Sequence, residues 1–252
     1  SNKYVVSTLG HLSFIAQNTS FWSKSFIQTA NIDATVTKFW DDNDDAGGVT
    51  GDRYNDANDI TSAGSNEGFL PIGYNRYSST KFTGEYDGNG FFIDNLKINR
   101  PSGAGSTWVG LFGYIEGGSI KNLKLSNVEI SGSSRVGSIA GRIYNGSSID
   151  NCYASGSVSG VNHVAGLIGE AYGTSSSNSN SVSNSFTNVS VFGTQYYIAG
   201  LAGYLRYSTV QNSYSIGSVV CTSTNYCPYY SGGLVAYRST GATVTNSFYD
   251  TT

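Results

Sequence analysis

The sequence predicts an all-β protein, built as a three-sided parallel β-helix with a short helix-containing N-terminal cap. The main observation is a degenerate unit that recurs along the chain, in which a Gly-rich apolar segment precedes an apolar-x-Asn triplet. Two consecutive copies begin at Val109 and Val136 and reach their triplets at Asn122 and Asn151. Self-similarity of this kind is typical of stacked repeats. No segment between the triplets has a sustained 3.6-residue apolar period with caps, so helical crossovers are disfavoured.

The spacing of the triplets indicates the shape of one coil. Six anchor asparagines end the triplets at intervals of 27 to 34 residues: Asn95, Asn122, Asn151, Asn184, Asn212 and Asn246. Three strands of about five residues, joined by corners that tolerate positive φ, fit the shorter intervals. We therefore expect these asparagines to stack about 4.8 Å apart in a hydrogen-bonded ladder.

The two-residue side-chain period of a strand predicts which neighbours of the anchors face the core. The apolar residue two positions before each anchor should point inward, as should the residue directly after it. The next residue then faces solvent and forms a column: Lys97, Lys124, Tyr153, Phe186, Tyr214 and Phe248. We predict that the four aromatic members bind a ligand.

Several motifs resemble the GLUG-motif family of bacterial cell-surface repeat proteins. They are the Gly-Leu-x-Gly strands followed by Ile-x-Asn, the segment Phe82 to Gly90, Ala30-Asn-Ile-Asp, and the closing Ser247-Phe-Tyr-Asp-Thr-Thr. The resemblance implies a right-handed β-helix of the kind found in adhesins and in the non-catalytic region of IgA-specific metallopeptidases. It implies no catalytic residues. An insertion at about 41–69 departs from the family pattern.

We expect one elongated domain over residues 1–252, with a cap at 1–40, an acidic insertion at 41–69 and coils at 70–252. Thr8 is predicted to cap a short helix that covers the open end of the first coil. A separate small domain is the alternative for residues 1–40.

The charge balance excludes some partners. The net charge is −3 and only 12% of residues are charged, without the clustered basic footprint that nucleic-acid binding needs. No apolar run approaches 18 residues, so no membrane span is expected. The start at Ser1-Asn2, without an initiator Met, suggests a mature or excised fragment of a secreted or surface protein.

Two segments outside the repeat pattern are candidate sites. Cys221 and Cys227 flank a five-residue loop that a disulfide could close in an oxidising compartment, the alternative being two free thiols. This loop region carries three further candidate ligand-binding residues: Tyr226, Tyr229 and Tyr230. In the acidic insertion, four aspartates are candidate Ca²⁺ ligands: Asp41, Asp42, Asp44 and Asp45. A solvated acidic loop is the alternative, and no other cofactor is expected.

An enzymatic function is the less favoured hypothesis. Parallel β-helices host polysaccharide lyases and hydrolases, and glycoside hydrolysis needs two carboxylates roughly 5 to 10 Å apart. Glu129 and Asp150 are predicted at different strand positions, and the arginines at 135, 142, 206 and 238 are scattered in the sequence. Asp87 lies in an Asp-Gly-Asn-Gly turn, which favours a structural role, and His-Glu-x-x-His is absent.

We therefore predict a non-catalytic adhesin or stalk segment that binds a glycan or a surface protein. The nineteen tyrosines support a contact surface, because amphipathic aromatic side chains suit one. A second aromatic set follows the Gly-x-x-Gly strands: Tyr114, Tyr144, Tyr172, Tyr204, Tyr207 and Tyr237. The alternatives are rings that only stabilise the coils of a pure spacer, and a polysaccharide-active enzyme.

Overall fold

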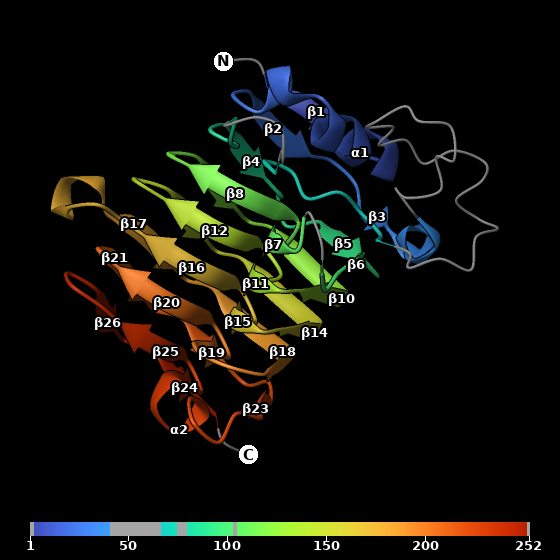
Figure 1. Ribbon diagram of the computed structural model, residues 1–252. Coiled ribbons are helices and arrows are strands. Elements are labelled where there is room, and N and C mark those ends of the chain that lie inside the picture. The colour runs from blue at the N-terminus through green and yellow to red at the C-terminus, as the bar shows by residue number, and fades with distance from the viewer. Residues whose placement is uncertain (1–2, 41–66, 75–79, 103–104, 251–252) are drawn as a thin grey trace.

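The computed structural model describes residues 3–40, 67–74, 80–102 and 105–250, and it confirms the predicted parallel β-solenoid (Figure 1). Strands from successive coils pair in parallel to form four sheets in this part of the chain. Sheet A contains β1 (Tyr4–Val6), β2 (Ser25–Gln28), β4 (Glu85–Asp87), β9 (Ser119–Lys121), β13 (Ser148–Asp150), β17 (Asn180–Ser183), β21 (Ser208–Gln211) and β26 (Thr243–Thr245).

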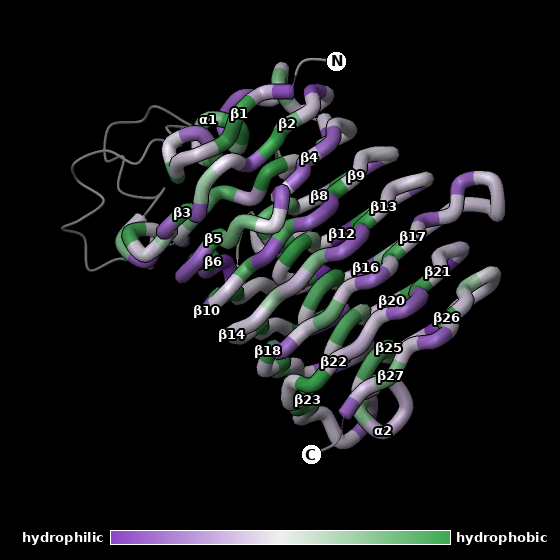
Figure 2. The backbone as a smooth tube through the Cα atoms, turned by 180° about the vertical axis from the view of Figure 1, so that it is seen from behind, coloured by the Kyte–Doolittle hydropathy of each residue, from purple (hydrophilic) through white to green (hydrophobic). Residues whose placement is uncertain are grey.

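The other long sheet, sheet B, adjoins sheet A on the side shown in Figure 2. It contains β3 (Ile32–Asp33), β5 (Phe92–Asp94), β6 (Lys97–Arg100), β10 (Lys124–Gly132), β14 (Tyr153–Gly160), β18 (Phe186–Gly193), β22 (Tyr214–Ser215), β23 (Val219–Cys221) and β27 (Phe248–Tyr249).

Two five-stranded sheets complete the solenoid on the side shown in Figure 1. Sheet C contains β8 (Phe112–Glu116), β12 (Ala140–Tyr144), β16 (Ile168–Tyr172), β20 (Ala202–Arg206) and β25 (Val235–Arg238). Sheet D contains β7 (Thr107–Val109), β11 (Ser134–Val136), β15 (Asn162–Ala165), β19 (Ile198–Ala199) and β24 (Ser231–Gly232).

The coils that contribute to all four sheets therefore have four or more strand segments, where the sequence predicted three. The Gly-rich segment is not one strand, because the chain bends at Gly137–Ile139 between β11 and β12. Stacking continues through the bend, where the Ile139 N–H donates to the Leu167 carbonyl at 3.1 Å. A Cβ at Gly137 would lie 2.6 Å from that same carbonyl oxygen, so the bend requires glycine.

The predicted inward positions form the core. Ile120, Ile149 and Val182 are fully buried two positions before their anchors. Directly after the anchors, Leu123 and Cys152 give way to buried serines in later coils: Ser185 and Ser213. Each serine donates to a carbonyl of its own coil and accepts a backbone N–H from the preceding coil, as Ser185 Oγ does from Cys152 at 3.1 Å. These buried hydroxyls are thus satisfied, and the core tolerates them.

The anchor asparagines form corners with left-handed backbone. All six have φ between 47° and 60°, a region that asparagine enters at lower cost than most residues. Asn151 Nδ2 donates to Asn122 Oδ1 at 2.8 Å, and Asn246 Nδ2 donates to Asn212 Oδ1 at 3.4 Å. The ladder changes partner at Asn184, whose amide donates to Asp150 Oδ1 at 2.7 Å.

Asn95 does not belong to this ladder, so its predicted register is wrong. Its strand, β5, belongs to sheet B, where Asp94 pairs with Ser126, and Asn95 therefore stacks on Asn127. In the coil that precedes Asn122, the corresponding corner is the turn that begins at Asp87, because Asp87 pairs with Lys121. The prediction failed because the Ile-x-Asn triplet occurs at both corners of the early coils.

Asp87 has a structural role as the last acceptor of the ladder. Its Oδ1 accepts from Asn122 Nδ2 at 2.9 Å and from the Asn89 backbone N–H at 3.0 Å. Burial by itself raises the pKa of Asp87, but these hydrogen bonds and the Lys3 ammonium together hold the pKa below its usual value.

The N-terminal segment covers one end of the solenoid. α1 (Leu9–Gln17) begins after Thr8, whose Oγ1 accepts the His11 N–H at 3.2 Å, and buries Leu12 against the core. β1 and β2 extend sheet A beneath it. The remaining helical segments are η1 (Thr19–Phe21), η2 (Thr35–Phe39), η3 (Ser176–Asn178) and α2 (Cys227–Tyr230). No helix in the described part of the chain is long and apolar enough to cross a membrane.

Substitutions at Asn151 test the left-handed corner. Asn151→Gly should lower the free energy of unfolding by about 1 kcal/mol, because it removes one ladder hydrogen bond and keeps a permissive backbone. Asn151→Ala should cost roughly 1–2 kcal/mol more, because alanine disfavours positive φ. Urea unfolding measures both variants, and equal losses would contradict the left-handed assignment.

Candidate binding surfaces

The surface column predicted from the sequence exists on sheet B with one change of membership. Register pairing aligns Phe92, Lys124, Tyr153, Phe186, Tyr214 and Phe248, which we call the lysine–aromatic column. Lys97 is not a member, because it pairs with Glu129 one corner further along the coil and forms an ion pair with it. Phe92 takes its place, and the Lys124 ammonium lies 5.1 Å from the centre of that ring.

Rings in this column stack on one another. Phe186 lies 4.9 Å from Tyr214 and Tyr214 lies 5.4 Å from Phe248, both pairs with planes 7° apart, and Tyr153 lies 4.4 Å from Phe186. Stacked rings cover each other's faces and leave mainly their edges to solvent. Phe248, 63% exposed, ends the stack. Each pair contributes about 0.5–1.5 kcal/mol to stability beyond burial.

A second aromatic surface covers the outside of sheet C. The strands of this sheet face the viewer in Figure 1. We call this surface the tyrosine face, and it consists of Tyr114, Tyr144, Tyr172, Tyr204 and Tyr237. Successive ring centres lie 5.8 to 6.4 Å apart. The Arg142 guanidinium lies among them, 5.1 Å from the Tyr114 and Tyr172 ring centres and 4.8 Å from that of Tyr144. Cations held over aromatic faces in this way are attracted by the ring quadrupoles.

Beside the tyrosine face, sheet D carries a column of strained residues. Trp108, Arg135, His163 and Tyr197 stack in successive coils, and we call them the corner column. Their φ angles lie between 53° and 62°. Unlike asparagine or glycine, such residues adopt this conformation at a cost of roughly 1–2 kcal/mol each. Strain of this kind collects at functional sites.

Glycines beneath the corner column make the strained backbone possible. A Cβ at Gly141 would lie 2.5 Å from Trp108 Cα, and one at Gly169 would lie 2.6 Å from the Arg135 carbonyl carbon. In the last coil, where β25 pairs with β20, Ala236 stands at the register of Gly203. The matching corner residue there, Tyr230, lies in α2 instead. Glycine at this position of the repeat (Gly141, Gly169 and Gly203) thus occurs in the coils that have a strained corner residue, and alanine replaces it in the coil that has none.

A buried carboxylate joins the two surfaces. Glu170 is 4% exposed; Arg135 Nε donates to its Oε2 at 2.8 Å, and Arg142 Nε lies 3.0 Å from the same oxygen. His163 Nε2 lies 4.0 Å from Oε1. Burial lowers the pKa of His163 to about 4, although Glu170 opposes this, so the ring is neutral at neutral pH. Two arginines therefore face one carboxylate.

The cluster of Arg135, Arg142 and Glu170 is not predicted from the sequence. Arg135 and Arg142 looked scattered along the chain, but the bend between β11 and β12 brings both to Glu170 in the next coil. The corner column carries a signal that could have been used. Each member directly precedes the Val or Ile that begins a repeat, so aligning the repeats one residue further upstream would have shown it.

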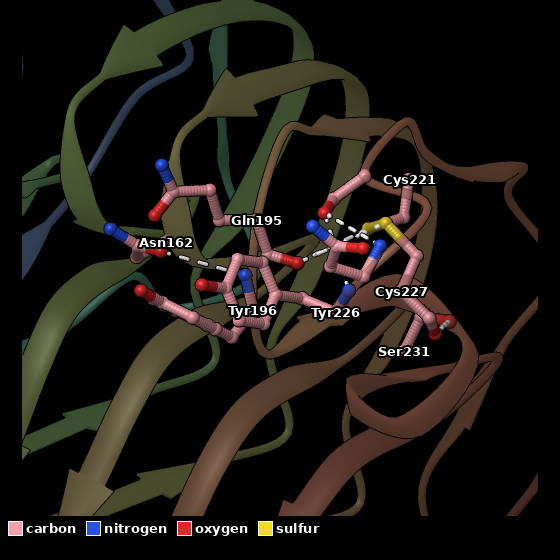
Figure 3. The surroundings of a disulfide bond; sticks show 9 residues. Asn162, Gln195, Tyr196, Cys221, Tyr226, Cys227 and Ser231 are labelled. Atoms are coloured by element: carbon pink, nitrogen blue, oxygen red, sulfur yellow. Dashed lines mark hydrogen bonds between the residues drawn. A yellow bond between two sulfur atoms is a disulfide. The ribbon is translucent and has the colours of Figure 1, made fainter.

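The cysteine loop extends the tyrosine face. Cys221 and Cys227 are joined by a disulfide with their Cα atoms 5.6 Å apart (Figure 3). Tyr226 lies 4.4 Å from Tyr196, and Tyr230 lies 5.3 Å from Tyr197 and 5.8 Å from Tyr237, measured between ring centres. The loop thereby brings Tyr230 to the last ring of the tyrosine face and Tyr226 to Tyr196, the neighbour of Tyr197 in the corner column, while Tyr229 is 76% exposed.

The predicted aspartate ligands and the free cysteine are the remaining candidate sites. Asp41, Asp42, Asp44 and Asp45 lie outside the described residues. Within residues 3–40, 67–74, 80–102 and 105–250, no three His, Cys, Asp or Glu side chains come together as a metal site. Cys152 is a buried thiol whose pKa burial raises to about 12, so it is not a reactive nucleophile.

Comparison with known proteins finds similarity to one family model and to parts of several much longer proteins. Residues 62–156 match the family model described as M26 IgA1-specific Metallo-endopeptidase N-terminal region. The chain is 31% identical to an immunoglobulin A1 protease of Streptococcus pneumoniae over 169 residues, which are 67% of this chain and 8% of that protein. It is likewise 31% identical to halomucin of Haloquadratum walsbyi over 169 residues, 66% of this chain and 2% of halomucin.

The match to this N-terminal region covers less than half of the chain, and the chain spans only 2% to 10% of the length of these relatives. An immunoglobulin A1 protease of Streptococcus sanguinis is 29% identical over 195 residues, 10% of its length. The crystal structure of a proposed immunoglobulin A1 protease from Bacteroides ovatus shares the fold, with a TM-score of 0.61 and 18% identity over 98% of this chain and 67% of that one. The narrower resemblance to the GLUG-motif family stays a prediction.

The pKa of His163 predicts a pH dependence of stability. The pKa of His163 in the folded protein, about 4, lies below the ordinary 6.5. Between pH 4 and pH 6.5 the side chain is therefore protonated in the unfolded chain and neutral in the folded one. The free energy of unfolding should fall as the pH drops, by about 2 kcal/mol between pH 7 and pH 5.

His163→Asn is the matched control, because asparagine suits the left-handed backbone and does not titrate. Urea unfolding at both pH values should show a smaller loss in this variant than in the unmodified protein. Equal losses would show that His163 is not the responsible group.

Proposed function

We propose that this chain is a non-catalytic segment of a secreted or cell-surface protein and that it binds a glycan through the tyrosine face. The observation that carries the proposal is the coincidence of three features on one outer surface. Aromatic rings, cations and strained backbone meet where the tyrosine face adjoins the corner column. Tyrosine suits such a surface, because its ring gives apolar contact and its hydroxyl gives a hydrogen-bonding end.

The state of the carboxylates supports a non-catalytic role. Glu170 is held by Arg135 and Arg142, and Glu129 by Lys97, so both are neutralised by ion pairs. A glycoside hydrolase needs one protonated and one free carboxylate facing the same sugar. The match to the N-terminal region of a metallopeptidase family agrees with a segment that accompanies catalysis elsewhere in a longer chain.

A spacer without a ligand is the second candidate, and the lysine–aromatic column favours it. Its ring centres lie 4.4 to 5.4 Å apart, closer than the 5.8 to 6.4 Å of the tyrosine face, so its rings cover more of one another's faces and offer a smaller platform for a sugar. Binding through Tyr153, Phe186, Tyr214 and Phe248, and through Tyr226, Tyr229 and Tyr230, stays a prediction from the sequence. So does Ca²⁺ binding by the aspartates at 41, 42, 44 and 45.

A glycan array probed with the whole chain tests the proposal. Replacing Tyr144 and Tyr172 together by Ser should abolish the signal, because both rings lie on sheet C around Arg142. The triple replacement of Tyr153, Phe186 and Tyr214 by Ser should leave the signal while lowering the melting temperature, because it removes stacked pairs.

The array is read with Ca²⁺ and with a chelator, which tests the predicted aspartate ligands separately. Circular dichroism confirms that each variant is folded. Loss of signal only in the triple variant would contradict the proposal and place the glycan site on sheet B. If no glycan gives a signal, the glycan-binding proposal is rejected and the spacer is the remaining candidate function.

A further inference from the structure

We infer that the corner column, with Arg135 at its centre, binds the anionic group of an acidic saccharide, a carboxylate or a sulfate. The inference rests on the proposed glycan binding by the tyrosine face and names the class of glycan. It is carried by the charge balance of the corner, by the way Arg135 is held, and by the polar groups that flank it.

The corner is cationic on a protein whose net charge is negative. Arg135 and Arg142 share the single carboxylate of Glu170, and His163 is neutral at neutral pH. Lys81 adds a third cation, with its ammonium 5.2 Å from the Trp108 ring centre and 4.7 Å from that of Tyr114. The Glu116 carboxylate acts on Lys81, so three cations face two carboxylates here. An anion that docks at this corner therefore meets a net positive charge between aromatic walls.

The two arginines have different freedom. Arg142 lies among three tyrosine rings and keeps 17% of its side chain exposed. Arg135 is held through Nε by Glu170 and keeps 29% exposed, so the buried carboxylate orients a guanidinium that still reaches solvent. A guanidinium oriented in advance binds carboxylate or sulfate oxygens at a smaller entropic cost than a free one. Arg135 is thus the cation placed to contact the ligand.

The neighbours of Arg135 carry unsatisfied polar atoms. Trp108 precedes it in the column and His163 follows it, each one strand spacing away, about 4.8 Å. Within the described structure, Trp108 Nε1 and His163 Nδ1 are buried without a hydrogen-bond partner. The unsatisfied atoms and the left-handed backbone of all three residues both lower the stability of the folded protein at this corner. Both features are expected of a ligand site.

Isothermal titration calorimetry on the whole chain tests the inference with three probes: sialyllactose, sulfated lactose and lactose. The two acidic probes should bind, and more weakly at high salt, while lactose should bind at least about tenfold more weakly. Comparing the acidic probes distinguishes a carboxylate from a sulfate ligand. In a parallel NMR titration, sialyllactose should shift the indole N–H signal of Trp108, assigned with Trp108→Phe.

Arg135→Gln should weaken the acidic probes by roughly tenfold or more, because it removes the charged hydrogen bonds. Arg135→Lys should retain part of the affinity. Lys124→Gln is the matched control, because it removes one cation from sheet B and should leave the affinity unchanged. Melting curves establish that all three variants are folded.

Three results would overturn the inference: equal binding of lactose and sialyllactose, unchanged affinity in folded Arg135→Gln, and tighter binding of an oligoglutamate peptide than of either acidic sugar. If neutral glycans bind the tyrosine face and acidic ones bind no better, the proposed function stands and this inference fails. If no glycan of either class binds, both fail.

Discussion

Every surface of this protein depends on parallel backbone hydrogen bonding between coils that stay in register. In the coils from β12 onward, residues 28 positions apart, or up to 34 where a loop intervenes, are placed one strand spacing from each other. The asparagine ladder, the lysine–aromatic column, the tyrosine face and the corner column are four consequences of this one constraint. A shift of one residue would turn every side chain of a strand to the opposite face.

Among the left-handed corners of the solenoid, the anchors and the corner column differ in the residue types that adopt positive φ, and this difference separates structure from candidate function. At the anchors, asparagine adopts positive φ cheaply and its amide bonds to the neighbouring coil. At the corner column the same φ is imposed on Trp, Arg, His and Tyr, which gain no such ladder. The fold tolerates this strain because the backbone around it is fully stacked and glycines make room beneath it.

Much of the fold follows from the local chemistry of the repeat, whereas the site does not. Ile120, Ile149 and Val182 face inward as alternation requires, because each strand has one dry face. The prediction for Asn95 is wrong, because local sequence does not distinguish two corners that share one triplet. The meeting of Arg135 and Arg142 at Glu170 depends on a bend inside a segment that reads as one strand. Such convergence is a tertiary property that neither periodicity nor residue type encodes.

Cysteine cross-linking tests the register most directly. Ser157 and Ser190 are exposed partners on β14 and β18, and strand neighbours about 4.8 Å apart lie within disulfide range. The account predicts that Ser157→Cys with Ser190→Cys forms a disulfide under mild oxidation, detected by mass spectrometry. It also predicts that Ser157→Cys with Asn188→Cys, displaced by two residues along β18, does not. Cross-linking of the displaced pair in place of the aligned one would contradict the stacking on which all four surfaces depend.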